Sequence, residues 1–333
     1  MIDLLRQHPD ELEALVSSAA EHLKLEPAFV EKDFWVTEVL RCTVQPRTIV
    51  DKDGQVGEVR VIFKGGTSLS KGFDLIKRFS EDVDILVVFP EDCSVGAKDN
   101  ALKKICADVR EHLGLGEEQT RNEGSSKGVK RHMRYTPFTT YDARDITKGV
   151  LLEMGVRGGK LPVKTVTIQS IVSKFAREAL NADSSDWAEF APVQVEVLGP
   201  ERTLLEKMSA MHDAATRYVD SGNETILGKG GRHYYDIHCL AQSHEVRQSL
   251  ADLGVAGVRE LVTDIMNHSE AAGFSSTAAP AQGLATSIAF SADSPAMECI
   301  RSSYATAGGL IYEDSIPTIE QCLESARSLQ TLV

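Results

Sequence analysis

The sequence predicts an α+β protein, in which an N-terminal domain with a small mixed sheet precedes a largely helical C-terminal domain. Apolar residues that alternate or run together, as they do in strands, occur near residues 59–63, 83–89 and 149–156. In the second half of the chain, apolar residues recur mainly at the three- and four-residue spacing of amphipathic helices. We therefore expect an α/β domain over residues 1–165 and a helical domain over residues 166–333.

Two helices are predicted before the first strand. Residues 10–25 have an amphipathic pattern, and Pro27 can occupy the first position of a second helix that carries Phe34 and Leu40. Residues 45–58 are rich in turn-forming residues, so we expect a connection there.

A glycine turn follows the first strand. Gly65 and Gly66 come directly after the alternating strand and let the backbone turn tightly and approach a ligand closely. Thr67 is predicted to be the N-cap of a helix that carries Leu69 and Phe73 at helical spacing. The free N–H groups at the start of a helix behind glycines can bind a phosphate.

Two aspartates open the next strand. Asp82 and Asp84 flank the first residue of a buried apolar run, and because side chains alternate along a strand they point to the same side. Neighbouring carboxylates repel each other, and a hard cation such as Mg²⁺ (or Mn²⁺) relieves this repulsion while it binds phosphates. This unit therefore predicts a site for a nucleoside triphosphate and a divalent cation. The alternative is a pair of solvated surface carboxylates.

A third carboxylate lies in a later strand. We expect a helix at 97–113, a mobile loop at 115–130, and two or three strands between 131 and 156. Glu153 is the one acidic residue of the apolar strand 149–156, where a carboxylate is costly unless it is paired or metal-bound. The alternative is a strand with one solvated face.

The remaining pattern is mainly helical. The predicted elements are a helix at 168–180, a strand at 193–197, a helix at 201–218, a loop at 221–231, a helix from 232, and helices around 245–267 and 317–332. Lys207 lies at the margin of the apolar stripe of its helix, a position where lysines commonly extend their charged end to solvent.

Composition favours a soluble, cytoplasmic protein. Hydrophobic residues make up 42% of the 333 and charged residues 26%, and no apolar run is long enough to span a membrane. The N-terminus lacks the basic start and apolar core of a signal peptide. The six cysteines are scattered without a Cys-x-x-Cys pair, which argues against a zinc site or a disulfide framework.

The net charge of −13 disfavours nucleic-acid binding overall, but one segment is basic. Residues 121–164 contain ten Lys and Arg against four Asp and Glu. Within this segment we expect Lys127, Lys130, Arg131 and Arg134 to contact a polyanion such as RNA. The alternative is a solvated charged surface.

Several of these motifs together resemble a known family. The glycine turn followed by an Asp-x-Asp pair resembles the signature of nucleotidyltransferases related to DNA polymerase β. More narrowly, residues 65–67 and 78–84 are similar to the AbiEii/AbiGii toxin family of bacterial type IV toxin–antitoxin and abortive-infection systems. Residues 200–207 resemble its Glu-Lys motif, and residues 232–236 its Arg…Asp motif.

The resemblance covers roughly residues 28–242, because residues 31–35 also resemble the opening helix of the family. One departure is the run His233-Tyr234-Tyr235 before Asp236, where another basic residue is expected. No motif is evident in residues 243–333.

The resemblance implies a polymerase β-like nucleotidyltransferase domain and assigns roles to individual residues. Catalytic roles fall to Asp82, Asp84, Glu153, Lys207 and Asp236. Asp82, Asp84 and Glu153 would be metal ligands, with Glu153 either the third ligand or the general base. Nucleotide binding falls to Gly65, Gly66, Thr67, Ser68, Arg78, Ser80 and Lys207. Asp236 would orient Lys207 or the substrate.

By this resemblance the protein is a Mg²⁺-dependent toxin that transfers NMP from an NTP to RNA. The acceptor implied is the 3′ end of tRNA, which would block translation, and a cognate antitoxin is implied as partner. Two alternatives are nucleotidylation of a protein side chain and a non-catalytic role, as either a nucleotide-binding regulator or a DNA-binding partner protein. The complete carboxylate set and the lack of an evident basic helix-turn-helix argue against the second alternative.

Overall fold

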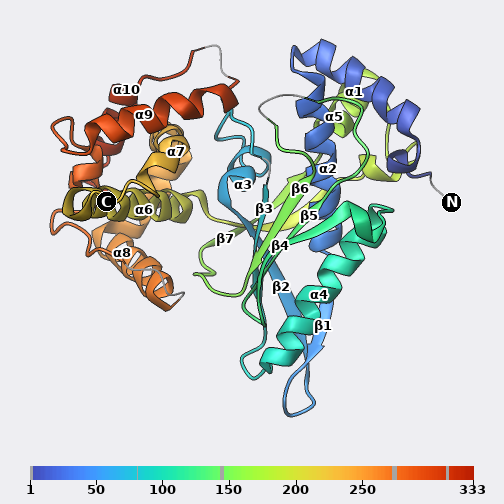
Figure 1. Ribbon diagram of the computed structural model, residues 1–333, viewed down its shortest axis with the longest axis horizontal. Helices are drawn as coiled ribbons and strands as arrows, with labels where there is room; N and C mark the ends of the chain where they lie inside the picture. The colour runs from blue at the N-terminus through green and yellow to red at the C-terminus, as the bar shows by residue number, and fades with distance from the viewer. Residues whose placement is uncertain (1–2, 81, 143–145, 272–275, 313–314) are drawn as a thin grey trace. The chain divides into compact units, whose positions relative to one another are not determined.

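The chain folds into two compact units. The computed structural model describes residues 3–80, 82–142, 146–271, 276–312 and 315–333 (Figure 1). Unit 1 consists of Met1–Gly72, Ser80–Val156 and Val163–Val197. Unit 2 consists of Phe73–Phe79, Arg157–Pro162 and Leu198–Val333. The domain boundary predicted after residue 165 falls within unit 1.

Unit 1 contains a mixed sheet. Its strands are β1 (Arg47–Val50), β2 (Val56–Lys64), β3 (Asp82–Val88), β4 (Thr120–Ser126), β5 (Lys130–Tyr135), β6 (Val150–Gly155), β7 (Val163–Ile168) and β8 (Val193–Leu198). Their order is β4-β5-β6-β3-β2-β8-β7, and β1 pairs with β2. The β3–β6 and β2–β8 pairs are parallel, whereas β2–β3, β4–β5 and β5–β6 are antiparallel. The predicted α+β class with a mixed sheet is confirmed.

The helices of unit 1 are α1 (Pro9–Leu23), α2 (Pro27–Thr43), α3 (Gly65–Lys71), α4 (Val95–His112) and α5 (Ile171–Ala179). All of these except α3, which follows β2 at the glycine turn, lie over one face of the sheet. α2 packs against β3 and β6, α4 packs against β5, and α1 and α5 pack on α2 (Figure 1). Val83, Ile85 and Val87 of β3 and Leu152 and Met154 of β6 are completely buried. Because side chains alternate along a strand, the acidic residues of β3 and β6 lie on the opposite face.

Three elements of unit 1 differ from the predictions. Residues 45–58 contain β1 and the start of β2, and residues 115–130 contain β4 instead of a mobile loop. Ile168 ends strand β7 and does not begin a helix. β4 is a polar edge strand, and an element without a buried face has no apolar periodicity to reveal it.

The helix after the glycine turn is shorter than predicted. α3 begins at Gly65 and ends at Lys71, so Thr67 is not its N-cap. The Thr67 hydroxyl instead donates to the Asp82 carbonyl, which ties α3 to β3. Phe73 lies beyond the helix, and Asp74 has a φ of 52°, a left-handed conformation that does not continue a helix.

Unit 2 consists mainly of helices. They are α6 (Pro200–Ser221), α7 (Gly231–Gln242), α8 (His244–Ala271, kinked at Gly254), α9 (Met297–Ala307) and α10 (Ile319–Arg327). α6 packs on α7 and α8, and α7 packs on α9 and α10. The predicted helices are confirmed, and α9 was not predicted.

Short 3₁₀ segments occur in both units. They lie at Leu5–Gln7, Glu117–Gln119, Ala188–Phe190, Leu227–Lys229, Leu284–Thr286, Ile288–Phe290 and Gly308–Leu310. None of the helices described here has the length and apolar content that crossing a bilayer requires.

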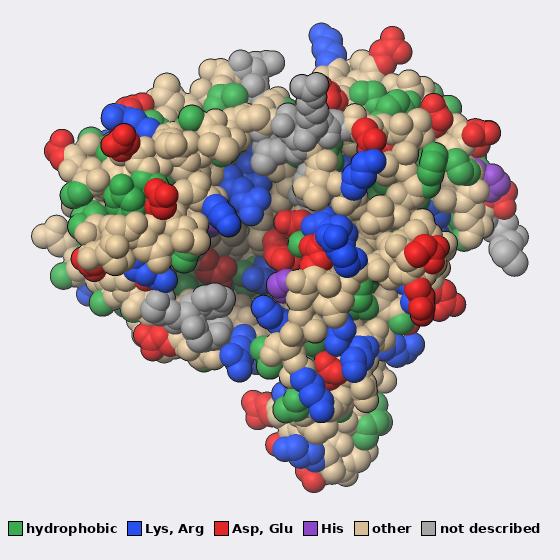
Figure 2. Space-filling view, in the orientation of Figure 1, with side chains coloured by type: hydrophobic (Ala, Val, Ile, Leu, Met, Phe, Trp, Pro, Cys, Tyr) green, Lys and Arg blue, Asp and Glu red, His purple; other side chains and the backbone are tan. Residues whose placement is uncertain are grey.

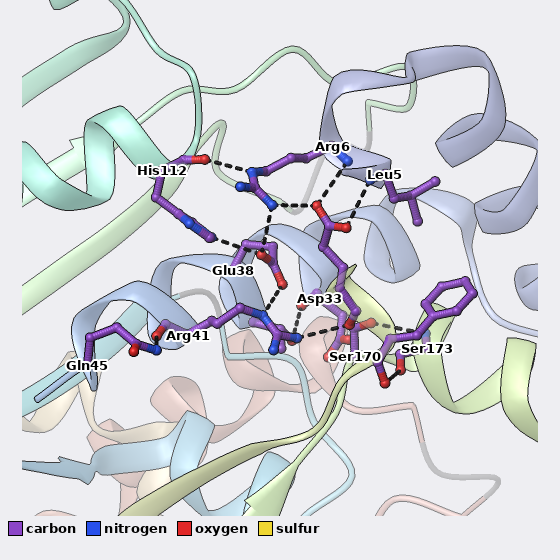
Figure 3. Close-up of polar contacts among 12 residues, drawn as sticks. Leu5, Arg6, Asp33, Glu38, Arg41, Gln45, His112, Ser170 and Ser173 are labelled. Carbon is purple, nitrogen blue, oxygen red and sulfur yellow. Dashed lines mark hydrogen bonds and ion pairs between the residues drawn. The ribbon is translucent and has the colours of Figure 1, made fainter. Parts of the chain in front are cut away.

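A buried ionic network joins the N-terminal segment to α2 and α4 (Figure 3). Glu38 accepts from Arg41 Nε at 2.8 Å and contacts His112 Nε2 at 2.9 Å. Arg6 lies 3.8 Å from Glu38 and bonds to Glu189 at 2.6 Å. Burial opposes ionisation of Glu38, but His112 and Arg41 outweigh it and lower its pKa. These contacts tie the N-terminal segment, α2 and α4 to one another.

Glu38→Gln should therefore destabilise unit 1 by about 3 kcal/mol, because it leaves buried cations without a counter-charge. The low pKa of Glu38 means that its contribution is present above the ordinary carboxyl pKa of 4.5 and is lost as pH falls through the lower, folded value. Both tryptophans, Trp35 and Trp187, lie in unit 1, so urea unfolding followed by tryptophan fluorescence measures this effect.

Asp108→Asn is the matched control, because Asp108 pairs with Arg47 at a more exposed position and should cost at most about 1 kcal/mol. Equal destabilisation by the two variants at pH 7 would contradict the assignment of Glu38 as the centre of the network.

Candidate active site

Four ionisable residues form a row across four adjacent strands of unit 1. Asp84 of β3 pairs in register with Lys64 of β2 on one side and with Glu153 of β6 on the other. Glu153 in turn pairs with His132 of β5, and His132 Nδ1 lies 3.3 Å from Glu153 Oε1. Asp82 precedes Asp84 by two residues on the same strand face. This row lies on the sheet face opposite the helix-covered core.

The glycine turn lies directly against this row. Gly65 has a φ of 78°, and a side chain there would collide with the Asp84 carboxylate. The Ser68 hydroxyl donates to the Gly65 carbonyl at 2.9 Å, and both Thr67 and Ser68 are buried. The Thr67 hydroxyl, which donates to the Asp82 carbonyl, holds the turn against β3, and the Ser68 hydroxyl closes the turn on itself. The group nearest to Gly65 is the Asp84 carboxylate.

The row contains a strongly perturbed carboxyl group. Burial, together with the negative charges of Asp84 and Asp82, raises the pKa of Glu153 to about 7. Lys64 opposes this rise. Burial and the positive charge of Lys130 lower the pKa of His132. At neutral pH, Glu153 is therefore able both to accept and to release a proton.

The donor set suits Mg²⁺ bound together with a substrate. Mg²⁺ takes oxygen ligands and usually binds through one or two carboxylates plus substrate phosphates. Asp84 and Glu153 are close enough to raise the pKa of Glu153, and a cation would relieve that repulsion. Within the residues that the structure describes, no three acidic, His or Cys side chains converge into a complete metal site. These residues fit a metal that is completed by phosphate oxygens.

A second charged cluster lies inside unit 2. Asp236 of α7 is fully buried and accepts from Arg78 Nε at 2.6 Å and from Arg78 Nη2 at 2.7 Å. Lys207 Nζ of α6 lies 2.8 Å from Asp236 Oδ2 and 3.2 Å from His233 Nδ1. Asp236 thus holds the Lys207 ammonium nitrogen by a direct contact. Arg78 is 2% exposed and bidentate on the same carboxylate.

Burial and neighbouring charges shift the pKa of the titratable groups in this cluster. Burial opposes ionisation of Asp236, but Arg78 and Lys207 outweigh it and lower its pKa. Burial and Lys207 lower the pKa of His233 to about 3, so its ring is neutral at pH 7 and Nδ1 can accept from Lys207. Burial lowers the pKa of Lys207, and Asp236 opposes that change. Arg78 and Lys207 both contact the one Asp236 carboxylate.

The other predicted residues are distributed as follows. Ser80 is half-buried just before β3. Lys127 and Lys130 are exposed. Arg131 faces α4 and bonds to Asp99, so it lies on the opposite sheet face from Lys130. Arg134 shares the face of Lys130 but forms two bonds to Glu123, at 2.6 and 3.1 Å.

Sequence reasoning missed three residues of these clusters. Lys64 is the last residue before the glycine turn, and His132 shares a strand face with Lys130 and Arg134. The alternation of β5 could have placed His132 on the charged face, but the register that brings it to Glu153 is not readable from one strand. His233 appeared only as a departure from the expected motif.

A glycine turn, a strand with two aspartates and a glutamate of raised pKa define a site typical of phosphoryl and nucleotidyl transfer. The chain belongs to the family described as nucleotidyl transferase AbiEii toxin, type IV toxin–antitoxin system, whose family model matches residues 55–272. The protein is therefore a nucleotidyltransferase toxin by family, which implies a cognate antitoxin. The match excludes residues 31–35 and continues beyond residue 242. No curated protein sequence matches the chain.

The raised pKa of Glu153 predicts a particular pH dependence of stability. Between pH 4.5 and about 7 the folded chain retains a proton that the unfolded chain has lost, so wild-type stability should fall as pH rises through this window. Glu153→Gln removes this titration and should have a higher Tm than wild type at pH 8, with a smaller difference at pH 5.

Thermal unfolding from pH 5 to 8.5 measures this difference. Glu58→Gln removes an exposed carboxylate of β2 and serves as the control. If the Tm curves of wild type and Glu153→Gln run parallel over the whole range, the pKa of Glu153 is not raised.

Proposed function

We propose that the protein transfers NMP from an NTP to the 3′ end of tRNA, with Mg²⁺ bound by Asp82 and Asp84, and so blocks translation. The observation that carries this proposal is the in-register Asp84–Glu153 pair against the Gly65 turn. It combines oxygen ligands for a metal, a backbone surface for phosphates and a carboxylate that can take a proton near pH 7. Polymerase β-like topology of the sheet is part of this proposal.

The carboxylates divide into two roles. Asp82 and Asp84 share one strand face and act as metal ligands, and Mg²⁺ supplies charge neutralisation at the phosphates when it is bound. Glu153 lies in register beside Asp84 and accepts the proton of the attacking hydroxyl as general base. The hydroxyl oxygen forms a bond to the α-phosphorus, the bond from that phosphorus to the bridging oxygen breaks, and pyrophosphate leaves.

The triphosphate is bound through backbone and cationic groups. Residues 65–68 bind the phosphates through their backbone N–H groups, because the Thr67 and Ser68 hydroxyls are already bonded to the Asp82 and Gly65 carbonyls. Ser80 adds a hydroxyl that binds the triphosphate. Lys207 stabilises charge on the leaving pyrophosphate as a compact point charge. Arg78 acts through Asp236, because its guanidinium is buried on that carboxylate.

An RNA acceptor is supported by the strand next to Glu153. Lys130, His132 and Arg134 alternate along β5 and therefore share the sheet face of Glu153. Figure 2 shows many Lys and Arg side chains over the region in which Figure 1 draws β4 and β5. Positive charge beside the proposed base favours an acceptor with phosphates. Lys127 lies in the turn between β4 and β5, whereas Arg131 belongs to the opposite face of the sheet.

Asp84→Ala and Asp82→Ala should each abolish transfer with little change in Tm. Wild type incubated with total RNA, total protein and each labelled NTP in turn should label tRNA, and EDTA should stop the reaction. Label confined to protein would replace the RNA acceptor by a protein acceptor. Full transfer by either variant, or by wild type in EDTA, would exclude the proposed site.

Lys207→Met should reduce transfer at least about a hundredfold while unit 2 stays folded, because a pyrophosphate-stabilising charge is lost but Asp236 keeps its bonds to Arg78. Lys207→Arg should restore little, since a planar guanidinium does not replace a compact ammonium. Transfer rates and Tm are measured in parallel. A large loss of Tm with unchanged transfer at low temperature would make Lys207 a structural residue.

A further inference from the structure

Three consecutive charged residues of α2 each hold a different part of unit 1. Glu31 and Lys32 are 3% and 8% exposed, and the Asp33 side chain is 14% exposed. Successive helical residues project about 100° apart, so these three side chains reach different neighbours. The segment lies outside the family-model match, and the proposed reaction gives it no role.

Lys32 fixes the chain that enters β6. Its Nζ donates to the Thr147 carbonyl at 2.7 Å and also to the Gly149 carbonyl. Gly149 has a φ of 72°, and a side chain there would collide with the Tyr135 carbonyl, so this turn has little freedom. Gly149 precedes β6, on which Glu153 follows four residues later. Lys32 therefore fixes the start of β6, the strand that carries the proposed base Glu153.

Asp33 fixes α3. One carboxylate oxygen pairs with Lys71 Nζ, and the other accepts from the Ile171 N–H at 2.7 Å. Lys71 is the last residue of α3, and the first residue of that helix, Gly65, lies beneath the Asp84 carboxylate. α3 is short, so a shift at Lys71 is passed directly to the glycine turn.

Glu31 holds the segment before the β6 turn. Its two carboxylate oxygens accept from the Thr140 and Tyr141 N–H groups at 2.9 and 3.0 Å. Burial raises the pKa of Glu31, although these two bonds oppose the rise. Buried charges of this kind are costly to fold, and apolar residues of the same size often give more stability. Their presence at three successive positions indicates that they fix geometry.

We propose that Lys32 and Asp33 are positioning residues for nucleotide transfer. Lys32 sets the position of Glu153, and Asp33, through Lys71, sets the position of the Gly65 turn under Asp84. This inference rests on the proposed function. It predicts that the two residues affect different kinetic constants, because the base acts on the chemical step and the turn acts on the nucleotide.

Steady-state kinetics of Lys32→Met and Asp33→Asn test this directly. Lys32→Met should lower kcat about ten- to a hundredfold with little change in KM for the NTP, as expected when a catalytic group is misplaced. Asp33→Asn and Lys71→Met should mainly raise that KM, about tenfold, whereas Lys71→Arg keeps the ion pair and should restore most of the affinity.

Asp108→Asn is the control, because it removes a partly exposed ion pair of the same unit and should change neither constant. Binding of a non-hydrolysable NTP analogue, measured by calorimetry, should weaken in Asp33→Asn and stay near wild type in Lys32→Met. All rates are measured at a temperature at which each variant is fully folded.

Two failures are distinguishable. If wild type transfers NMP while Lys32→Met and Asp33→Asn lower only Tm and keep wild-type kcat and KM, the inference is overturned and the proposed function stands. If wild type transfers NMP to no RNA or protein acceptor, the proposed function fails and the inference fails with it.

Discussion

The parallel, in-register pairing of β3 with β6 is the constraint on which the site depends. It places Asp84 against Glu153, and the negative charge of Asp84 makes ionisation of Glu153 less favourable. A slip of one residue would turn Glu153 toward the apolar core, so the buried face formed by Val83 and Leu152 also fixes the chemistry. The repulsion between these carboxylates destabilises the folded chain, and the same negative charge attracts cations to the site.

In both units, buried charged side chains hold other parts of the chain and other charged groups in position. In unit 1, Lys32 and Asp33 tie α2 to the turns beside the carboxylates, and Glu38 ties α2 to α4. In unit 2, Asp236 holds Lys207 and Arg78. Each arrangement uses short, multiply bonded contacts instead of solvated side chains, so the positions of the charged groups are fixed before a substrate arrives. Preorganised charge of this kind is what transfer of a nucleotidyl group requires.

The strongly periodic parts of the fold could be predicted from sequence, and the cross-strand parts could not. α2, α6 and strand β3 have clear apolar patterns. These patterns also allowed Asp82 and Asp84 to be placed on β3 and Lys207 on α6. β4 was missed because both of its faces are polar, and α3 was predicted too long because Leu69 and Phe73 have helical spacing. Lys64 and His132 were missed because strand register depends on packing between distant segments. The Arg78–Asp236 pair joins residues 158 positions apart, which no local pattern reveals.

The proposed function requires the sheet face of unit 1 to bind a divalent cation together with a nucleotide. Electron paramagnetic resonance with Mn²⁺ and a non-hydrolysable NTP analogue measures this binding without requiring turnover or a known acceptor. Wild type and Glu58→Gln should bind Mn²⁺ alike when the analogue is present, and Asp84→Asn should weaken this binding at least about tenfold, as expected for loss of one of two carboxylate ligands. Equal Mn²⁺ affinity in wild type and Asp84→Asn would contradict the proposed function.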